Sequence, residues 1–493
     1  MSRVRAGSKL PNILLITTDT QRTDTLACMG NPHAVSPNLD RLAAEGVLFT
    51  EAYTASPVCS PARTSLLTGV HTPIHGVIEN GFTPRPGLTP FADLLAAAGY
   101  TNLMVGKTHF GPVPASFHYQ SVLKGKKPGT GDDFYARRLR AQGYEKSTAF
   151  PPPFPESLCE PAAVVSETIE MIERARKERP APFFAWCSIL GPHPPFDPPE
   201  RWAARYPDDA LPALNYRPGE VAEHPEHLRR LVGLSDRRPE APGFNPDGSP
   251  NWEVVNEERR RYYGLSAFCD DQVGRLIRYL DDAGLRDETL VIFTSDHGTE
   301  LYDHGFLNKH NYYDSTWRVP LIVSMPGTLP QGARRSFAHW NDLTATILGA
   351  AGGESPFVQG FNLLPSLQAT GEHSDSPRCC AAATLYRSCA LATKRWKLEY
   401  YFEEGNGRLF DRREDPLEQR DLFHSDDHKE VRAALLEALL TWRADLVDVE
   451  AFHRDNDGGG PVARRVQSLR AMSRGVDAER RLNERVARIE ARN

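Results

Sequence analysis

Residues 12–19 read Asn-Ile-Leu-Leu-Ile-Thr-Thr-Asp, a short apolar run that ends in a carboxylate. The stretch Thr-Leu-Val-Ile-Phe-Thr-Ser-Asp-His-Gly at residues 289–298 has the same form. Continuous runs of Ile, Val, Leu and Phe bounded by polar residues are typical of strands that are buried on both faces of a parallel sheet. These two stretches therefore predict an α/β fold in which Asp19 and Asp296 follow the ends of strands.

Further apolar runs of the same kind extend the predicted sheet, at Tyr100–Gly106, Phe183–Leu190 and Val319–Met325. Segments with helical periodicity and capping residues lie among these runs, at Leu39–Ala44, Phe91–Ala98, Glu160–Lys177 and Val255–Ala283. Alternation of strands and helices is typical of a doubly wound fold. We therefore expect a large, mostly parallel sheet that is flanked by helices.

The pattern changes after about residue 375, where short β-prone pieces precede an amphipathic helix. They predict a smaller C-terminal antiparallel sheet with a covering helix, at Cys389–Thr393, Lys397–Phe402, Arg408–Asp411 and Lys429–Val447. We expect a large α/β domain over residues 1–375 and a small α+β subdomain over 376–450. Residues 451–493 form a polar, Arg-rich tail, which is expected either to contact a neighbouring subunit of a homo-oligomer or to stay mobile.

The composition excludes several classes of partner. The chain has 493 residues, of which 40% are hydrophobic, and its formal net charge is −6. It lacks the positive field that gathers nucleic acid or anionic membranes, so neither is an expected partner. The first apolar run is too short for a signal peptide or a membrane span, which favours a cytoplasmic protein. The eight cysteines show neither a Cys-x-x-Cys pair nor a dense disulfide framework.

The most specific motif lies at residues 59–69, which read Cys-Ser-Pro-Ala-Arg-Thr-Ser-Leu-Leu-Thr-Gly. It resembles the signature of the sulfatase family, within the alkaline phosphatase superfamily, in which a formylglycine-generating enzyme oxidises the cysteine to formylglycine. The resemblance implies that Cys59 is the precursor of the nucleophile and that Arg63 helps to orient it. A hydrated aldehyde carries two hydroxyls on one carbon, one to attack an ester and one to expel the covalent product later.

The two strand ends match the family's metal site. The resemblance implies that Asp19, Asp296, His297 and the oxidised Cys59 bind a divalent cation. Sulfatases commonly carry an acidic or amide side chain directly after the first aspartate, where this chain has Thr20, whose hydroxyl would be a weaker ligand. Gln21 could replace it only if the backbone bends, because neighbouring side chains of an extended segment point to opposite faces.

The ligand types restrict the choice of metal. Oxygen-rich ligation with one imidazole fits calcium, manganese or magnesium better than a structural zinc. Calcium is the first expectation, and His297 moves the balance towards manganese.

Further segments resemble family motifs: Gly106-Lys107-Thr108-His109, Gly191-Pro192-His193-Pro194-Pro195-Phe196, Leu307-Asn308-Lys309-His310 and Arg318-Val319-Pro320. Lys107 and His109 are two residues apart, so they share a face if the segment is extended. Arg63, Lys107 and Lys309 would supply a positive field around the equatorial oxygens of the substrate. His109 and His193 are the candidate proton carriers.

The resemblance extends to about residue 425, where Arg408-Leu409-Phe410-Asp411 and the acidic residues after it look like the family's closing motif. It implies the hydrolysis of a small-molecule sulfate ester. Members with the same formylglycine cleave phosphonate monoesters and phosphodiesters, and the motifs do not separate these activities. A third alternative is a binding protein that keeps the fold and leaves Cys59 unmodified.

Protein produced together with a formylglycine-generating enzyme should carry an aldehyde at residue 59, because the Cys-x-Pro-x-Arg core is present. Ala62 stands where serine is commoner, and we expect it to lower the yield of conversion. Mass spectrometry of the peptide that contains Cys59 measures the converted fraction, with Cys59→Ala as the control. An active preparation in which this peptide is entirely thiol would contradict the prediction.

Overall fold

The protein, described by a computed structural model, divides into two compact units that are not continuous in sequence. The first unit contains Met1–Ala52, Leu95–Thr108 and Val113–Arg335, and the second contains Tyr53–Leu94, His109–Pro112 and Ser336–Asn493. The predicted domains 1–375 and 376–450 are continuous, so their boundary does not coincide with this division. The structure describes residues 10–226, 228–230, 243–245, 247–369, 376–446 and 475–492.

The main sheet has eight strands in the order β4-β3-β5-β1-β6-β7-β2-β8. Neighbouring strands from β4 to β6 are parallel, whereas β7 is antiparallel to both β6 and β2. The predicted mostly parallel sheet is therefore confirmed. The strands are β1 Asn12–Thr18, β2 Val47–Tyr53, β3 Thr101–Lys107, β4 Tyr119–Leu123, β5 Phe183–Ser188, β6 Thr289–Ser295, β7 Leu321–Ser324 and β8 Ala333–His339.

The sequence predicts the central strands of this sheet and misses β2 and the two strands at its edges. β1, β3, β5 and β6 are buried along their whole length, which produces the continuous apolar runs. The edge strand β4 is mostly half-buried or exposed, and β8 begins Ala-Arg-Arg-Ser with alternate exposed residues. Edge strands carry polar side chains and so lack the apolar run on which the prediction depends.

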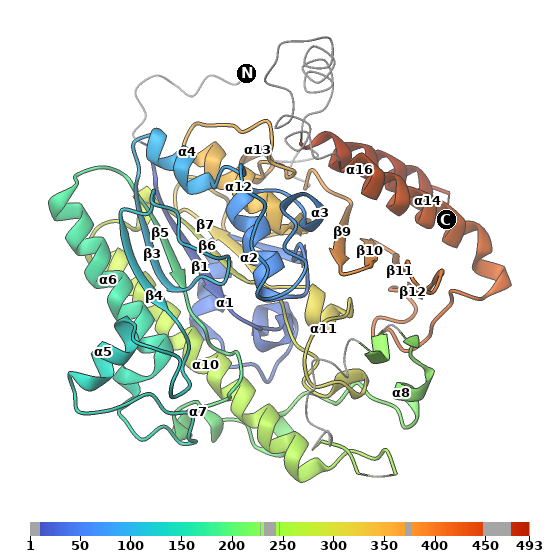
Figure 1. Cartoon of the computed structure of the whole chain (residues 1–493), viewed down its shortest axis with the longest axis horizontal. Coiled ribbons are helices and arrows are strands. Elements are labelled where there is room, and N and C mark those ends of the chain that lie inside the picture. The colour runs from blue at the N-terminus through green and yellow to red at the C-terminus, as the bar shows by residue number, and fades with distance from the viewer. Residues whose placement is uncertain are drawn as a thin grey trace. The chain divides into compact units, whose positions relative to one another are not determined.

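Two long helices of the first unit lie along the sheet (Figure 1). α6 packs against β3 and β5, and α10 packs against α6. Their apolar faces form one core with the central strands. Among the described residues, no helix combines the length and the apolar composition needed to cross a membrane. The helices of this unit are α1 Pro37–Ala44, α5 Phe134–Arg140, α6 Glu160–Glu178, α7 Glu200–Ala203, α8 Glu220–Glu223, α10 Trp252–Asp282 and α11 Asp314–Trp317.

The second unit contains a four-stranded antiparallel sheet, which confirms the smaller C-terminal sheet. The sequence misses its first strand, β9, in which three consecutive alanines give no β-prone pattern. The strands are β9 Cys380–Leu385, β10 Ser388–Thr393, β11 Trp396–Tyr401 and β12 Asn406–Asp411. The helices are α2 Cys59–Thr68, α3 Thr72–His75, α12 Trp340–Ala350, α13 Leu364–Gln368, α14 Lys429–Asp445 and α16 Asp477–Glu490, and α4 Phe91–Ala97 begins in this unit and ends in the first.

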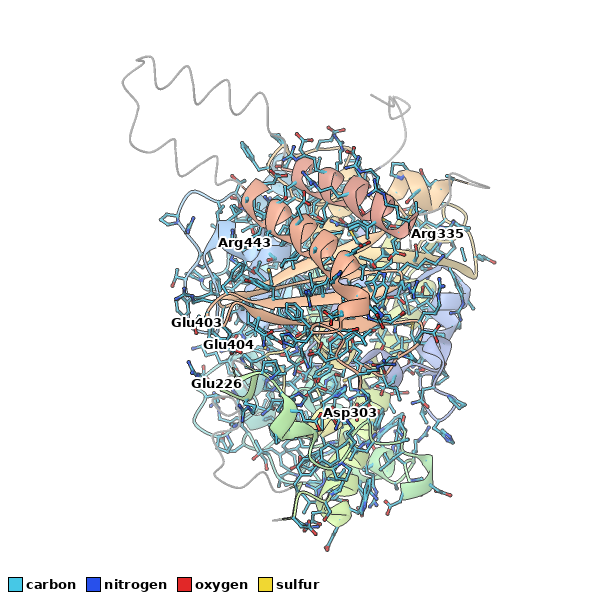
Figure 2. The ribbon with its side chains drawn as sticks, turned by 90° about the vertical axis from the view of Figure 1, so that its right-hand side faces the viewer. Glu226, Asp303, Arg335, Glu403, Glu404 and Arg443 are labelled. Atoms are coloured by element: carbon cyan, nitrogen blue, oxygen red, sulfur yellow. The ribbon has the colours of Figure 1, made fainter. Side chains whose placement is uncertain are left out.

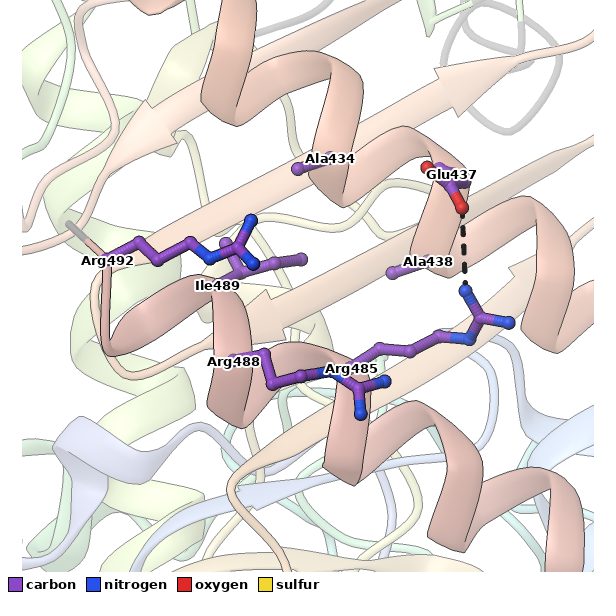
Figure 3. Close-up of a pocket in the computed structure, with 7 residues that line it drawn as sticks. All are labelled: Ala434, Glu437, Ala438, Arg485, Arg488, Ile489 and Arg492. Carbon is purple, nitrogen blue, oxygen red and sulfur yellow. Dashed lines mark ion pairs between the residues drawn. The ribbon is translucent and has the colours of Figure 1, made fainter.

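The tail folds back onto its own chain. α16 lies beside α14 and also contacts β9 (Figures 1 and 2). The two helices leave a shallow cavity of about 210 Å³ between them, where Arg485 lies 3.5 Å from Glu437 (Figure 3). The sequence predicts contact with a neighbouring subunit or mobility for this segment. Residues 477–490 pack within the second unit, so mobility does not describe them, and the subunit contact stays a prediction. Residues 451–474 of the predicted tail lie outside the described residues.

A buried ionic network joins α16 to the second unit. Glu479 of α16 is fully buried and pairs with Arg378, whose guanidinium also binds Asp342 at 2.6 and 2.8 Å. Glu479 Oε1 accepts hydrogen bonds from Trp442 Nε1 at 2.7 Å and lies 2.9 Å from His71 Nε2. The Arg378 charge, the His71 charge and the hydrogen bond from His71 hold the pKa of Glu479 well below its ordinary value, against the opposing effect of burial.

Glu479→Gln should destabilise the protein by about 3 kcal/mol, because it leaves the buried Arg378 charge with one partner fewer. Urea denaturation measures the loss, with Glu484→Gln on the exposed face of α16 as the matched control. Since the pKa of Glu479 is lower in the folded state, its contribution to stability is fully present above the unfolded pKa of ~4.3 and is lost as the pH falls through the folded value. Equal stability of the two variants would contradict the prediction.

Candidate active site

The carboxyl ends of adjacent parallel strands meet at one edge of the main sheet, within the first unit. Thr18 of β1 pairs with Ser295 of β6 in the parallel register. Thr17 of β1 pairs with Ser188 of β5, and Gly106 of β3 pairs with the same serine. Side chains that directly follow these strands therefore lie close together, at the edge where α/β folds commonly bind ligands.

Asp19, Asp296 and His297 bring two carboxylates and one imidazole to this edge, and none of them is exposed. Their candidate ligand atoms lie within 4.8 Å of one another. His297 Nε2 lies 3.7 Å from Asp19 Oδ1 and 3.7 Å from Asp296 Oδ1. His297 Nδ1 lies 2.7 Å from the Gly298 carbonyl oxygen, so the ring donates from Nδ1 and directs the Nε2 lone pair towards the carboxylates.

These donors fit a divalent cation. Two carboxylates and one imidazole match the oxygen-rich ligand sets of calcium, manganese and magnesium. Burial lowers the pKa of His297 well below its ordinary value, and the Lys309 ammonium lowers it further. The imidazole is therefore neutral near pH 7, which is the form that binds a metal.

Thr20 connects the two carboxylates. Its hydroxyl donates to Asp19 Oδ1 at 2.6 Å, and its backbone N–H donates to Asp296 Oδ1 at 3.2 Å. It has a φ of 69°, a left-handed conformation that a β-branched residue rarely adopts. The Tyr262 hydroxyl donates to the Thr20 carbonyl at 2.8 Å and so supports this conformation. The sequence does not predict this role of Tyr262, because its spacing on α10 is that of an ordinary core residue.

The bend at Thr20 meets the condition for a contribution from Gln21. The Gln21 Nε2 donates to Thr25 Oγ1 at 3.0 Å, whereas the amide oxygen Oε1, the atom that could bind a cation, is buried without a hydrogen-bond partner among the described residues. The Gln21 backbone N–H donates to Ser295 Oγ at 2.9 Å. Gln21 thus helps to tie the end of β1 to the end of β6.

Two buried lysines add positive charge beside the carboxylates. Lys107, the last residue of β3, forms an ion pair with Asp19 Oδ2. Lys309 Nζ lies 3.1 Å from His297 Nε2. Burial lowers the pKa of Lys107 to about 7, with Lys309 adding to the effect and Asp296 opposing it. The structure thus brings Lys107 and Lys309 to the predicted ligands within one unit.

A turn of the chain returns Lys309 to His297. The Glu300 N–H donates to the Asn308 carbonyl at 2.7 Å, and the Leu301 N–H donates to the Leu307 carbonyl at 3.1 Å. Gly298 permits the close approach of a neighbouring segment, because a Cβ at this position would lie 1.9 Å from the Ser315 carbonyl oxygen. Residue 298 must therefore be glycine in this conformation.

The two candidate histidines have different surroundings. His193 is half-buried, and its Nδ1 lies 2.6 Å from the Pro194 carbonyl oxygen. Burial lowers the pKa of His193 well below its ordinary value, and the charges of Lys107 and Lys309 lower it further. His109 is exposed and has a φ of 59°. The expectation that Lys107 and His109 share a face does not hold, because β3 ends at Lys107 and the chain then turns.

The predicted nucleophile lies on α2 in the second unit. Cys59 is the first residue of this helix, and every residue of α2 is buried. Arg63 is four residues later and so lies on the same face of α2 as Cys59. The Ser60 N–H donates to Asn80 Oδ1 at 3.0 Å, and the Thr344 hydroxyl donates to the Leu66 carbonyl at 2.6 Å. These bonds fix both ends of the helix that carries the motif.

The Sulfatase family model matches residues 11–353, and the model described as N-sulphoglucosamine sulphohydrolase, C-terminal, matches residues 302–445. An arylsulfatase of Clostridium perfringens is 28% identical over 465 residues, which are 85% of this chain and 92% of that protein. A multifunctional alkaline phosphatase superfamily protein of Trinickia caryophylli is 30% identical over 408 residues, which are 74% of this chain and 78% of that protein. All of the predicted site residues lie within residues 11–353.

A solved structure has a similar fold. The phosphonate monoester hydrolase of Agrobacterium radiobacter matches with a TM-score of 0.76 at 25% identity, and the match covers 89% of this chain and 96% of that chain. The similarity thus extends over both units of the chain.

Asp296→Asn should lower turnover by about a hundredfold or more and reduce the bound divalent metal, because it removes the charge of a ligand. The melting temperature should change little, since no apolar core is emptied. Turnover and metal content of the purified variant are the measurements, and Asp287→Asn at an exposed position is the control. Wild-type turnover that survives complete chelation of divalent cations would contradict the metal site.

Proposed function

The chain belongs to the sulfatase family, and we propose that it hydrolyses sulfate monoesters through a formylglycine that a formylglycine-generating enzyme makes from Cys59. The observation that carries this proposal is the Cys-Ser-Pro-Ala-Arg motif on the first turn of the buried helix α2, with Arg63 on the same face. The similarity to an arylsulfatase over most of the chain supports it.

The proposed site uses a modified residue, formylglycine 59, and a divalent cation. A hydrated formylglycine at residue 59 supplies one hydroxyl that attacks the ester and a second hydroxyl that later expels the sulfate group. A divalent cation, with calcium as the first choice and manganese or magnesium as alternatives, supplies Lewis acidity. Asp19, Asp296, His297 and the oxidised Cys59 would hold the cation, with Thr20 as a further candidate.

The chain's own cations are proposed to bind the substrate and stabilise the charge that develops on it. Arg63, Lys107 and Lys309 would bind the oxygens of the sulfate group. Lys309 would also donate a proton to the departing alcohol. Burial lowers the pKa of Lys107 to about 7, so its positive charge depends on neighbouring anions: Asp19 supplies one, and the substrate would supply another.

His193 is proposed to carry the proton that the second hydroxyl loses, with His109 as the other candidate. The low pKa of His193, which burial and the two lysines cause, keeps its imidazole neutral near pH 7. A neutral imidazole can accept a proton, and part of the His193 residue remains exposed to solvent. His109 is exposed and therefore suits contact with the leaving group better than contact with the nucleophile.

The second candidate function is the hydrolysis of phosphonate monoesters or phosphodiesters with the same residues. The similarity over 89% of the chain to a phosphonate monoester hydrolase favours it. Charge cannot decide between the two reactions, because a sulfate monoester and a phosphonate monoester each carry one negative charge. A phosphonate, however, has a carbon substituent where a sulfate has a third oxygen. Lys107, His193 and Lys309 crowd the same region, so we expect the carbon substituent to be disfavoured.

The choice is tested by kcat/KM for 4-nitrophenyl sulfate and for 4-nitrophenyl phenylphosphonate, measured on one preparation of known formylglycine content. We expect a higher kcat/KM for the sulfate. Cys59→Ala is the control that measures contaminating activity, because this variant cannot be converted to the aldehyde. A clear preference for the phosphonate would replace the first candidate with the second, and turnover of neither ester by converted protein would contradict both.

A further inference from the structure

Glu160 is a buried carboxylate that the proposed mechanism does not use. It is the first residue of α6 and is 2% exposed. A carboxylate at the first turn of a helix is stabilised by the unpaired N–H groups of that turn. Burial in the core raises the pKa of Glu160 to about 7, against the opposing charge of Lys126. A group that is so costly to bury needs strong partners.

The partners of Glu160 are two backbone N–H groups of a different segment. Leu190 donates to Glu160 Oε1 at 2.8 Å, and Gly191 donates to Glu160 Oε2 at 3.0 Å. These residues follow β5 and lead directly into the loop that carries His193. The His193 N–H donates back to the Leu190 carbonyl at 3.0 Å, so the turn that carries the imidazole starts from the segment that Glu160 holds.

The same segment packs closely against α6 and α10 at Gly191. A Cβ at Gly191 would lie 2.8 Å from the Cys269 sulfur and 3.3 Å from the Pro161 ring. The Gly191 carbonyl also accepts the Asp19 N–H at 3.3 Å, which ties the segment to the end of β1. The start of the loop thus contacts α6, α10 and the end of β1, and residue 191 has no room for a side chain.

A second buried pair holds the far end of the loop. Lys126 Nζ donates to the Pro195 carbonyl at 3.0 Å and forms an ion pair with Asp197. Lys126 and Asp197 are both mostly buried. Charge-assisted hydrogen bonds therefore lie on both sides of His193, one set from Glu160 before it and one from Lys126 after it.

We propose that Glu160 is a positioning residue for His193: its two carboxylate oxygens hold the Leu190 and Gly191 N–H groups and so fix the turn that presents the imidazole to the site. This inference rests on the role of His193 in the proposed function. Glu160 touches neither the substrate nor the reacting atoms, and it acts only through the backbone of the loop.

The first test needs no variant and no activity. Amide hydrogen exchange of the wild-type protein, read at single residues, should show Leu190 and Gly191 as protected as the amides of β5. Protection requires that the bonds to Glu160 persist in solution. Rapid exchange of both amides in the folded protein would overturn the proposal.

The second test uses Glu160→Gln, whose amide keeps the size of the side chain but can accept only one of the two N–H groups. We expect kcat to fall about tenfold and KM to stay within about twofold, because the imidazole is displaced while the groups that bind substrate are not. Glu167→Gln on the same helix is the matched control, since the Glu167 carboxylate accepts a hydrogen bond from the Ser121 hydroxyl and pairs with Arg138, away from the His193 loop. It should behave as the wild type.

A double-mutant cycle separates positioning from a general structural effect. In a His193→Ala background, Glu160→Gln should lower kcat by less than about twofold further, because the group that it positions is absent. A full tenfold loss in that background would overturn the proposal, as would Glu160→Gln with wild-type kcat. The cycle is run with whichever ester the wild type turns over. Failure of the proposed function therefore appears in the wild type, and failure of this inference appears only in the cycle or in the exchange rates.

Discussion

The first unit contains two buried carboxylates that repel each other, and the residues around them must compensate for this repulsion. Asp19 and Asp296 have no exposed surface, and their oxygens lie within 4.8 Å of each other. At an effective dielectric constant near 20, two like charges at that distance repel by roughly 3 to 4 kcal/mol, in addition to the cost of removing each from water. The parallel pairing of β1 with β6 enforces this proximity, because it brings Thr18 opposite Ser295. The surrounding residues must therefore supply positive charge and hydrogen bonds.

The neighbouring elements supply both. Lys107 from the end of β3 pairs with Asp19, and the Thr20 hydroxyl and N–H each donate to one of the two carboxylates. Thr20 does so in a left-handed conformation, which costs on the order of 1 to 3 kcal/mol and persists where the surroundings determine it. Tyr262 supplies part of that determination through the Thr20 carbonyl. Local backbone strain thus lies next to the candidate metal ligands, as expected of a functional site.

The sequence predicts those parts of this arrangement that depend on local patterns. The buried central strands give apolar runs, and the polar residues at their ends can be read directly, which locates Asp19, Asp296 and His297. The parts that depend on tertiary contacts leave no such trace. Nothing in the sequence around Glu160 distinguishes it from the surface glutamates of the same helix, because its partners are backbone groups thirty positions away. The sequence does not predict the turn at His109 either. The positive φ of this residue breaks the extended conformation in which the Lys107 and His109 side chains would share a face.

In the C-terminal tail, likewise, the sequence does not reveal that a charged side chain is buried. An Arg-rich, polar stretch indicates a solvated segment when only composition is considered, and the C-terminal family model ends at residue 445. Yet Glu479 of α16 is fully buried against Arg378, a partner 101 positions away in the chain. The cost of burying Glu479 is offset by a guanidinium, an indole N–H and an imidazole that converge on it from separate elements of the second unit. The helix is therefore held by specific pairing as well as by apolar contact. Any segment that replaces α16 must bring a carboxylate to the same point, or Arg378 keeps a buried charge that Asp342 alone must balance.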